Sequence, residues 1–338
     1  MLTIIFGAGA SFDSSPDFVV NNNNDNRLPL AKDLFSRRFS GIAKEFPIAF
    51  SLINRLRRSA NIEHELEKIA EENGSNIPEQ LIKIRRYINK VITTAQTNWE
   101  HITDRNTTYY EFIDILQKWQ EESKKPVTLI TFNYDTLLDT ACTTHLNLRF
   151  NDMNSYILND TPYKLFKPHG SINWTHFAQM PSGLPVNGIN IDRHAGQLQW
   201  TQYFSITSEA DVLKPGYYKF PAISVPTETK AMFEFPNNHK TEMKKAIHDT
   251  TTLLVIGWKA MEKHFLELWG TPEESKQLKK IQIVNSDQLR VNAITHNLST
   301  NGKIYSPSIN TYSGGFSKYV TDEFLKFLYD PIHRPEEM

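Results

Sequence analysis

The sequence predicts an α/β protein built on a Rossmann-like parallel sheet with helices on both faces. Apolar runs at 2–6, 126–133, 252–258 and 280–285 have the composition of buried strands, and a weaker run follows at 303–306. Segments with helical periodicity separate these runs, and such alternation is typical of a parallel sheet. We expect two additions: a large helical insertion after the first strand and a small irregular region of short strands and loops.

The domain organisation follows from shifts in composition along the chain. One domain is expected over residues 1–329, with a tail at 330–338. Residues 28–122 carry amphipathic helical patterns and form the insertion, in which Asn61 is placed to cap a helix. Residues 150–226 are rich in Asn, Pro, Gly and aromatic residues. We expect this stretch to lie as loops and small strands over the edge of the sheet.

Charge and cysteine content exclude several classes of function. Lys and Arg number 37 and Asp and Glu 38, a net charge of −1, so no direct nucleic-acid binding is expected. Cys142 is the only cysteine, which rules out an intrachain disulfide and a multi-thiolate zinc site. The tract HELEK puts Lys68 where a zinc protease has its second histidine, and we expect no metal. No secretory leader or membrane span is expected, and the predicted location is cytoplasmic.

A two-glycine turn, GAGAS at 7–11, directly follows the first apolar run. Such a turn lets the N–H groups of Gly7 and Gly9 approach an anion, and Ser11 adds a hydroxyl donor. The dinucleotide fingerprint needs a third glycine where Phe12 stands, so a hydride-transfer dehydrogenase is disfavoured. No G-K-S or G-K-T tract occurs, so no Walker loop is expected. The turn alone leaves a nucleotide site and a plain tight turn equally open.

The run at 126–133 ends in an amide and a carboxylate, Asn133 and Asp135. The carboxyl ends of parallel strands carry ligand-facing residues, so both side chains are expected to face one crevice. Asn133 is suited to orient a water molecule or a carboxamide, and Asp135 to bind ribose hydroxyls or stabilise positive charge. The alternative is that one of them caps the following helix, and the two roles can coexist.

A third pattern places His169 between Pro168 and Gly170, in a turn and not on an amphipathic face. Proline and glycine restrict the backbone there, which suits a side chain held in one orientation as a general base. The alternative is a turn histidine whose ring is satisfied by backbone groups.

Two later runs also end in residues that are common at ligand sites. Gly257 permits close backbone approach, and Asn285 and Ser286 offer groups for ribose or adenine. Glycine and asparagine are equally common in ordinary turns, so each signal is weak alone. No G-x-S-x-G elbow occurs, which disfavours a Ser-His-Asp hydrolase.

Taken together, GAGAS at 7–11, TFNYD at 131–135 and KPHGS at 167–171 resemble the ordered motifs of the sirtuin family. Sirtuins carry a GAG-x-S loop, a T-Q-N-x-D strand end and an H-G-S turn around NAD. The flanking tracts RLPLAKDLF, NYDTLLD and HGSINW are similar to divergent bacterial sirtuin-like proteins of anti-phage defence. The resemblance spans residues 1 to about 329, with 28–122 as an insertion.

Departures from the family pattern direct the expected chemistry. One cysteine cannot build the four-cysteine zinc ribbon of protein-deacylating sirtuins, and the F-G-E tract is missing. The G-T-S-type strand end is Gly257-Trp258-Lys259 here. These absences, with the resemblance to defence proteins, imply cleavage of NAD itself, with NAD as substrate and no metal.

The resemblance implies a role for each site residue. Asn133 orients water or the nicotinamide ribose, Asp135 supports the ribose or the nicotinamide amide, and His169 acts as base. The nicotinamide–ribose bond breaks through an oxocarbenium-like transition state, giving nicotinamide and linear or cyclised ADP-ribose. The residues expected to contact NAD are Gly7, Ala8, Gly9, Ala10, Ser11, Thr131, Gly257, Trp258, Asn285 and Ser286.

The resemblance also implies a regulated defence effector that depletes NAD, controlled by homo-oligomerisation or by a partner protein. One alternative is a non-catalytic module that binds NAD or ADP-ribose and reports it to a partner. A second is a protein deacylase or ADP-ribosyltransferase. The presence of both Asn133 and His169 favours catalysis, because a pure sensor has no need of a base.

Overall fold

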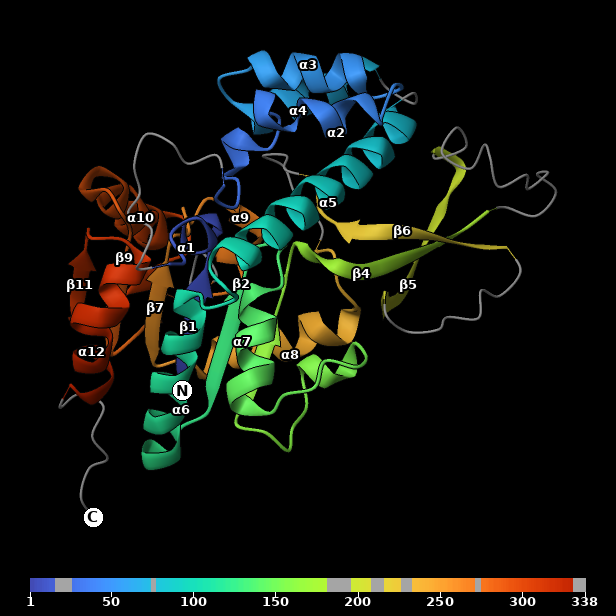
Figure 1. Ribbon diagram of the computed structural model, residues 1–338. Helices are drawn as coiled ribbons and strands as arrows, with labels where there is room; N and C mark the ends of the chain where they lie inside the picture. The colour runs from blue at the N-terminus through green and yellow to red at the C-terminus, as the bar shows by residue number, and fades with distance from the viewer. Residues whose placement is uncertain are drawn as a thin grey trace.

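The centre of the protein is a six-stranded, all-parallel sheet with strand order β11-β9-β7-β1-β2-β3 (Figure 1). The structure is a computed structural model that describes residues 1–15, 26–73, 77–180, 196–207, 216–225, 233–270 and 275–330. The strands are β1 (Leu2–Phe6), β2 (Val127–Thr131), β3 (Tyr163–Phe166), β7 (Thr252–Ile256), β9 (Lys280–Val284) and β11 (Ile309–Tyr312). Counted along the chain, this is the 3-2-1-4-5-6 order of a doubly wound nucleotide-binding sheet, and the predicted fold class is confirmed.

Strand β1 shows why continuous apolar runs form the centre of the sheet. All residues of Leu2–Phe6 are buried, because β2 and β7 pair with its two edges and helices cover its faces. The register places Leu2 opposite both Val127 and Thr252. A strand buried on both faces carries apolar side chains at almost every position instead of at alternate ones.

Helices cover both faces of the sheet. Figure 1 shows α6, α7 and α12 in front of it and α8 behind it. Their rings and aliphatic side chains fill one large core, in which Phe112 of α6 stacks on Phe324 at 4.1 Å and meets Phe6 of β1 edge-on. The helical elements around the sheet are α6 (Thr108–Ser123), α7 (Leu137–Leu146), α8 (Asn237–Asp249), α9 (Lys263–Leu266), α10 (Gln288–Thr300), α11 (Phe316–Tyr319), a π-helical turn (Val320–Phe324) and α12 (Leu325–Tyr329).

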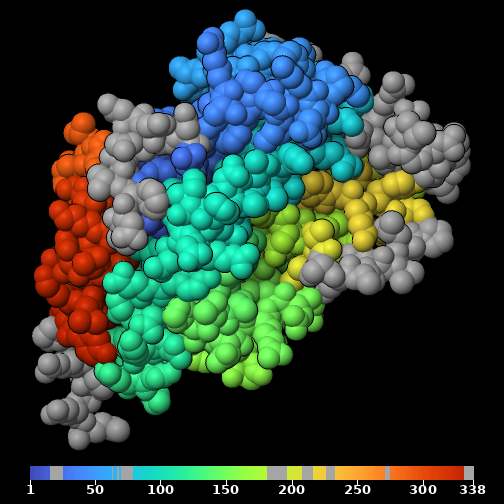
Figure 2. Space-filling model, in the orientation of Figure 1, coloured from blue at the N-terminus to red at the C-terminus, as the bar shows by residue number. Residues whose placement is uncertain are grey.

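The helical segment after β1 forms a second layer of structure with its own core. It follows α1 (Ala8–Phe12), which packs in the main core, and its elements are two 3₁₀ turns (Ala31–Asp33 and Arg37–Phe39), α2 (Ser40–Lys44), α3 (Phe50–Arg58), α4 (Ile62–Asn73) and α5 (Ile77–Ile102). Helices α2–α4 pack on the first half of α5 around buried rings such as Phe35, which stacks on Tyr87 at 5.5 Å. Asn61 caps α4 as predicted, since its Oδ1 accepts the N–H of His64 at 3.2 Å. This helical cap is the blue end of the molecule in Figure 2, and α5 runs from it to the central sheet (Figure 1).

A small antiparallel sheet, ordered β5-β4-β6, projects beside the cap (Figure 1). Its strands are β4 (Gly170–Gln179), β5 (Gln199–Ile206) and β6 (Tyr217–Ile223), preceded by a 3₁₀ turn (Asn154–Tyr156). The small strands expected within 150–226 are therefore present. Residues 181–195, 208–215 and 226 of that stretch, and 331–338 of the expected tail, lie outside the described residues.

Two strand expectations are wrong in detail. The run at 303–306 contains β10 (Ile304–Tyr305), which pairs with β8 (Lys276–Gln277) in a separate two-stranded sheet. The sixth strand of the main sheet is β11, and β3 is itself an edge strand of that sheet instead of one of the small strands expected to lie over its edge. Both edge strands have four residues, and β11 is largely exposed, so neither carries the continuous apolar run of a central strand.

Burial of His239 on α8 makes the stability of the fold depend on pH. The Nε2–H of its ring donates to the Met153 carbonyl at 2.7 Å, and burial lowers the pKa of His239 to about 4. The unfolded chain takes up this proton below pH 6.5, whereas the folded protein resists it until about pH 4. Stability contributed by the neutral ring is therefore lost as the pH falls through this window, by about 3 kcal/mol in total.

We expect the His239→Gln variant to lose less stability than the wild type between pH 7 and pH 4, measured by urea unfolding at each pH. The exposed His248, replaced by Gln, is the control and should leave the pH dependence unchanged. Equal pH slopes in the wild type and the His239→Gln protein would contradict the assignment.

Candidate active site

A cavity of about 1030 Å³ opens at the carboxyl edge of the parallel sheet. It spans the point between β1 and β7 at which the strand order reverses, which is where doubly wound sheets bind their ligands. Each of the six strands contributes a residue that follows it: Gly7 (β1), Asn133 (β2), His169 (β3), Gly257 (β7), Asn285 (β9) and Gly315 (β11).

The glycines after β1 and β7 pack directly against each other. Gly7 N–H donates to the Ile256 carbonyl at 3.0 Å, and Gly9 N–H to the Gly257 carbonyl at 3.1 Å. A Cβ on Gly9 would lie 2.9 Å from the Cα of Gly257, and one on Gly257 would lie 2.4 Å from the nitrogen of Ala10. The expectation that the N–H groups of these two glycines approach an anion is therefore corrected, because both already donate to carbonyls of the neighbouring turn.

The side chain of Asn133 is held in one orientation by buried hydroxyl groups. Its Nδ2 donates to Ser11 Oγ at 2.8 Å and to the Tyr109 hydroxyl at 3.3 Å, and these two hydroxyls lie 3.0 Å apart. Asn133 is only 5% exposed, and its Oδ1 has no hydrogen-bond partner among the described residues. A buried amide oxygen left in this way costs free energy unless a ligand or water satisfies it. Asn133 lines the cavity, so a ligand or a water molecule there can reach this oxygen.

Asp135 lies on the same turn and is also buried. Burial raises the pKa of this carboxyl group, while the charge of Lys167 and the Ser11 hydroxyl act in the opposite direction. Its Oδ1 accepts the N–H of Leu137 at 3.2 Å, at the start of α7. The helix-capping alternative is thus present in the structure, and the same side chain lines the cavity.

The ring of His169 lies beside this turn. A backbone hydrogen bond from Gly170 N–H to the Lys167 carbonyl at 2.9 Å closes the turn that carries it, and Gly170 has a φ of +80°. The imidazole centre lies 4.8 Å from the ring of Phe132 and 6.3 Å from that of Tyr134, the two aromatic residues that flank Asn133. Asparagine, aspartate and histidine therefore converge on one end of the cavity.

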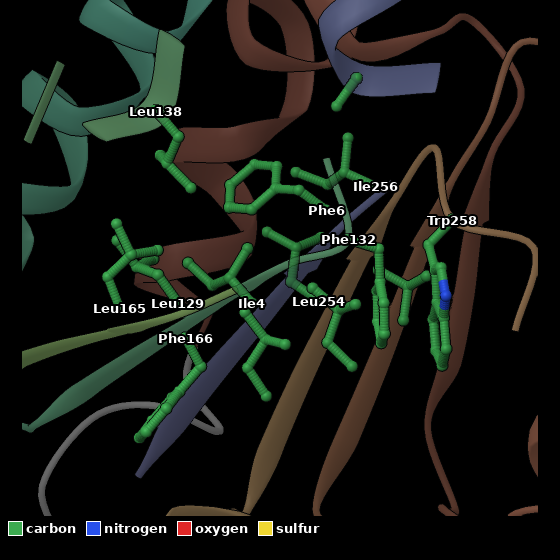
Figure 3. Packing of buried hydrophobic residues seen from close by; sticks show 14 of the residues in the cluster. Ile4, Phe6, Leu129, Phe132, Leu138, Leu165, Phe166, Leu254, Ile256 and Trp258 are labelled. Atoms are coloured by element: carbon green, nitrogen blue, oxygen red, sulfur yellow. The ribbon is translucent and has the colours of Figure 1, made fainter. Parts of the chain in front are cut away.

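Aromatic side chains form the floor next to the histidine. Phe132 and Trp258 are stacked with ring centres 5.0 Å apart and planes 5° from parallel (Figure 3). The ring of Phe265 meets both of them edge-on. The indole N–H of Trp258 donates to Glu262 at 2.7 Å, so the plane of the ring is fixed.

A buried ion pair joins the histidine turn to the Asn133–Asp135 turn. Lys167 has no exposed surface, and its Nζ donates to Asp139 Oδ2 at 2.8 Å and to the backbone carbonyl of Asp135 at 2.6 Å. The other carboxylate oxygen of Asp139 accepts the Tyr156 hydroxyl at 2.8 Å. Both charges are thus paired and hydrogen-bonded, which is the condition for burying them.

Of the residues predicted to form the site, the structure brings these to the cavity: Gly7, Ala8, Gly9, Ser11, Asn133, Asp135, His169, Gly257, Trp258, Asn285 and Ser286. Ala10 and Thr131 are not among the described lining residues. Ala10 packs in the main core, and the Thr131 hydroxyl accepts the backbone N–H of Asn133 at 3.1 Å.

Several residues that line or support the site were not predicted from the sequence, among them Lys167, Asp139 and Tyr109. Lys167 directly precedes the Pro-His pair and Asp139 follows Asp135 by one helical turn, so position alone could have singled them out. Tyr109 belongs to an ordinary amphipathic segment and carries no such signal.

Within the described ranges, no group of three or more His, Cys, Asp or Glu side chains is arranged to hold a metal ion. Over the same part of the chain, no helix has both the length and the apolar character needed to cross a membrane.

No family model matches this sequence, and no curated protein matches it. Solved structures similar to the chain include mutants of Sir2 homologues. Two are complexes with ADP-ribose, 12% and 13% identical with TM-scores of 0.42 and 0.40. A third is a complex with 2′-O-acetyl ADP-ribose, 11% identical with a TM-score of 0.40. In each case 97% of this chain and 91% of the other chain are covered.

These structures belong to the family that the three sequence motifs resemble.

The packing of the β1 and β7 turns predicts a large effect of a small substitution. Gly257 has a φ of +61°, and a methyl group would meet Ala10 at 2.4 Å, so Gly257→Ala should destabilise the protein by at least about 2 kcal/mol. Urea unfolding measures the loss. Gly41→Ala is the matched control, because nothing lies within 4 Å of its Cβ position, and it should be neutral or slightly stabilising. A mild effect at Gly257 would show that the two turns can separate.

The buried ion pair predicts a second stability effect. Lys167→Met leaves Asp139 buried without its partner, and we expect a loss of about 3–5 kcal/mol in the free energy of unfolding. Replacing both residues, as Lys167→Met with Asp139→Asn, should recover part of that loss. Lys326→Met breaks an exposed pair with Glu323 and should change stability by less than about 1 kcal/mol. Equal effects at the buried and exposed pairs would contradict the assignment.

Proposed function

We propose that the protein hydrolyses NAD⁺ at the nicotinamide–ribose bond, converting NAD⁺ and water into nicotinamide, ADP-ribose and a proton. The observation that carries this proposal is the buried, unpartnered Oδ1 of Asn133, which lines a cavity of about 1030 Å³ beside His169 and Asp135. A volume of that size accommodates a dinucleotide. This acceptor therefore fits a substrate that brings hydroxyl or amide N–H donors to Asn133.

The three polar residues have distinct roles in this proposal. Asn133 accepts a hydrogen bond at Oδ1 and so orients the attacking water or a ribose hydroxyl. His169 takes the proton from that oxygen as general base. Asp135 places carboxylate charge where positive charge develops on the ribose as the glycosidic bond breaks. The stacked rings of Phe132 and Trp258 exclude bulk water from this end of the cavity.

The remaining predicted contacts are assigned along the same edge of the sheet. We assign the pyrophosphate to the turn at Gly7–Ser11, which meets the cavity at Ala8. Because the glycine N–H groups are engaged with the β7 turn, the glycines act here mainly by allowing close packing. Asn285 and Ser286 are assigned to the adenosine end. In this proposal residues 1–329 act as one catalytic unit, with 150–226 beside the crevice.

The biological role proposed is that of a cytoplasmic anti-phage effector that depletes NAD when triggered. Its support is the resemblance of the tracts around the three motifs to bacterial defence proteins. Unregulated hydrolysis of NAD would harm the host cell. We therefore propose control by homo-oligomerisation or by a partner protein.

The test is nicotinamide release by the purified protein, incubated with NAD with and without candidate activators. We expect His169→Ala and Asn133→Ala each to lower the rate by about 100-fold or more, because a base and an oriented hydrogen-bonding group are removed. His248→Ala, on the exposed face of α8, is the control and should leave the rate unchanged. ADP-ribose binding, measured by calorimetry, shows whether each variant keeps a formed cavity.

Two outcomes would overturn the proposal. If NAD binds but no condition yields nicotinamide, the chain is a binding module that reports NAD or ADP-ribose. If release requires an acylated peptide or a protein acceptor, the activity is protein deacylation or ADP-ribosyl transfer.

A further inference from the structure

One face of helix α5 contacts the turns around the candidate site. Arg85, Asn89, Gln96 and Trp99 project from this face, since their spacing brings them within one stripe of the helix. Ile92 of the same stripe lines the cavity itself. Helix α5 therefore forms part of the cavity wall and also belongs to the helical cap.

The two ends of this stripe support the turn that carries His169 and the turn that follows β1. At one end, Arg85 pairs with Glu234 at 2.9 Å, and the backbone N–H of Glu234 donates to the Pro168 carbonyl of the histidine turn. At the other end, the indole N–H of Trp99 donates to Ser14 Oγ at 2.9 Å, and Ser14 Oγ donates to the Ser11 carbonyl.

Gln96 holds the turn between these two. Its Oε1 accepts the backbone N–H of Thr136 at 2.9 Å, and its Nε2 donates to Thr136 Oγ1 at 2.8 Å and to Glu100 at 2.6 Å. Gln96 is 9% exposed, so these bonds are shielded from water. The oxygen and the nitrogen of the Gln96 amide therefore both bind Thr136, the residue directly after Asp135.

This contact supplies a missing helix cap. Thr136 is the N-cap residue of α7 and makes no side-chain cap bond, and the first N–H groups of a helix have no partner within the helix. Asp135 takes one of them, that of Leu137, and Gln96 takes the N–H of Thr136 itself. Without Gln96, the N–H of Thr136 would lose its acceptor, directly beside the residue that carries the carboxylate.

We propose that Gln96 is a positioning residue of the site, which fixes the Asn133–Asp135 turn through its paired hydrogen bonds to Thr136. The inference builds on the proposed NAD hydrolysis. It assigns to the helical cap a part in positioning the site: Gln96 touches no substrate, but by binding Thr136 it holds the turn that carries the Asp135 carboxylate.

The test replaces Gln96 by Met, which has similar length and no amide. We expect kcat for nicotinamide release to fall about 10- to 100-fold, because small misplacements of reacting groups have effects of that size. KM for NAD should stay within about threefold. Thr97→Ala is the control on the next, exposed position of α5, where the hydroxyl bonds only within its own helix, and it should leave both constants unchanged.

Substitutions of Thr136 test the contact from the other side. Thr136→Ser keeps the hydroxyl and the N–H and should retain the wild-type kcat. Thr136→Val removes the acceptor for Gln96 Nε2 and should lower kcat without raising KM. If the contact only stabilised the fold, Thr136→Ser and Thr136→Val proteins of equal stability would have the same kcat.

Hydrogen exchange separates failure of this inference from failure of the proposed function. Whether or not the wild type releases nicotinamide, exchange in the peptide 132–140 should be faster in the Gln96→Met variant than in the Thr97→Ala variant. Unchanged exchange there overturns the inference, and so does an unchanged kcat in an active enzyme. A uniform rise in exchange along the whole chain also overturns it, because that result marks loss of global stability instead.

Discussion

The buried ammonium group of Lys167 is the constraint on which the rest of the site depends. A charge with no exposed surface is tolerated only where acceptors surround it, and its acceptors are Asp139 and the backbone of Asp135. Lys167 belongs to the histidine turn, whereas both acceptors follow the neighbouring strand β2. The position of His169 relative to Asn133 is therefore set by an ion pair that cannot be broken without exposing a charge to a nonpolar interior.

A steric constraint acts in the same way on the other side of the cavity. The turns after β1 and β7 touch backbone to backbone, and neither Gly9 nor Gly257 has room for a methyl group. Sequence motifs with two glycines are commonly interpreted as phosphate cradles, but here the glycine N–H groups bind the neighbouring turn. The glycines allow the two turns to pack in direct contact, and on the other side of the β1 turn the Ser11 hydroxyl accepts a hydrogen bond from Asn133.

The sequence predicts those parts of the molecule that local chemistry determines. Long apolar runs identified the central strands, and the flanking Pro168 and Gly170 correctly predicted that His169 lies in a turn, which faces the cavity. Strand β3 was not predicted as part of the main sheet and β11 was not predicted at all, because both are only four residues long and β11 is also largely exposed. Tyr109 and Gln96 come from amphipathic helices, in which periodicity shows which face is buried but not which distant turn it meets.

Helix α5 makes the helical segment part of the site. An insertion after the first strand suggests an appendage that the sheet could dispense with, and the cap does have its own apolar core. Yet Arg85, Gln96 and Trp99 of α5 hydrogen-bond to segments that support three separate site turns. Each of those turns is irregular backbone whose polar groups need partners from elsewhere. The sheet brings the reacting groups to one edge, and the helix fixes their directions, so the two layers make a single site.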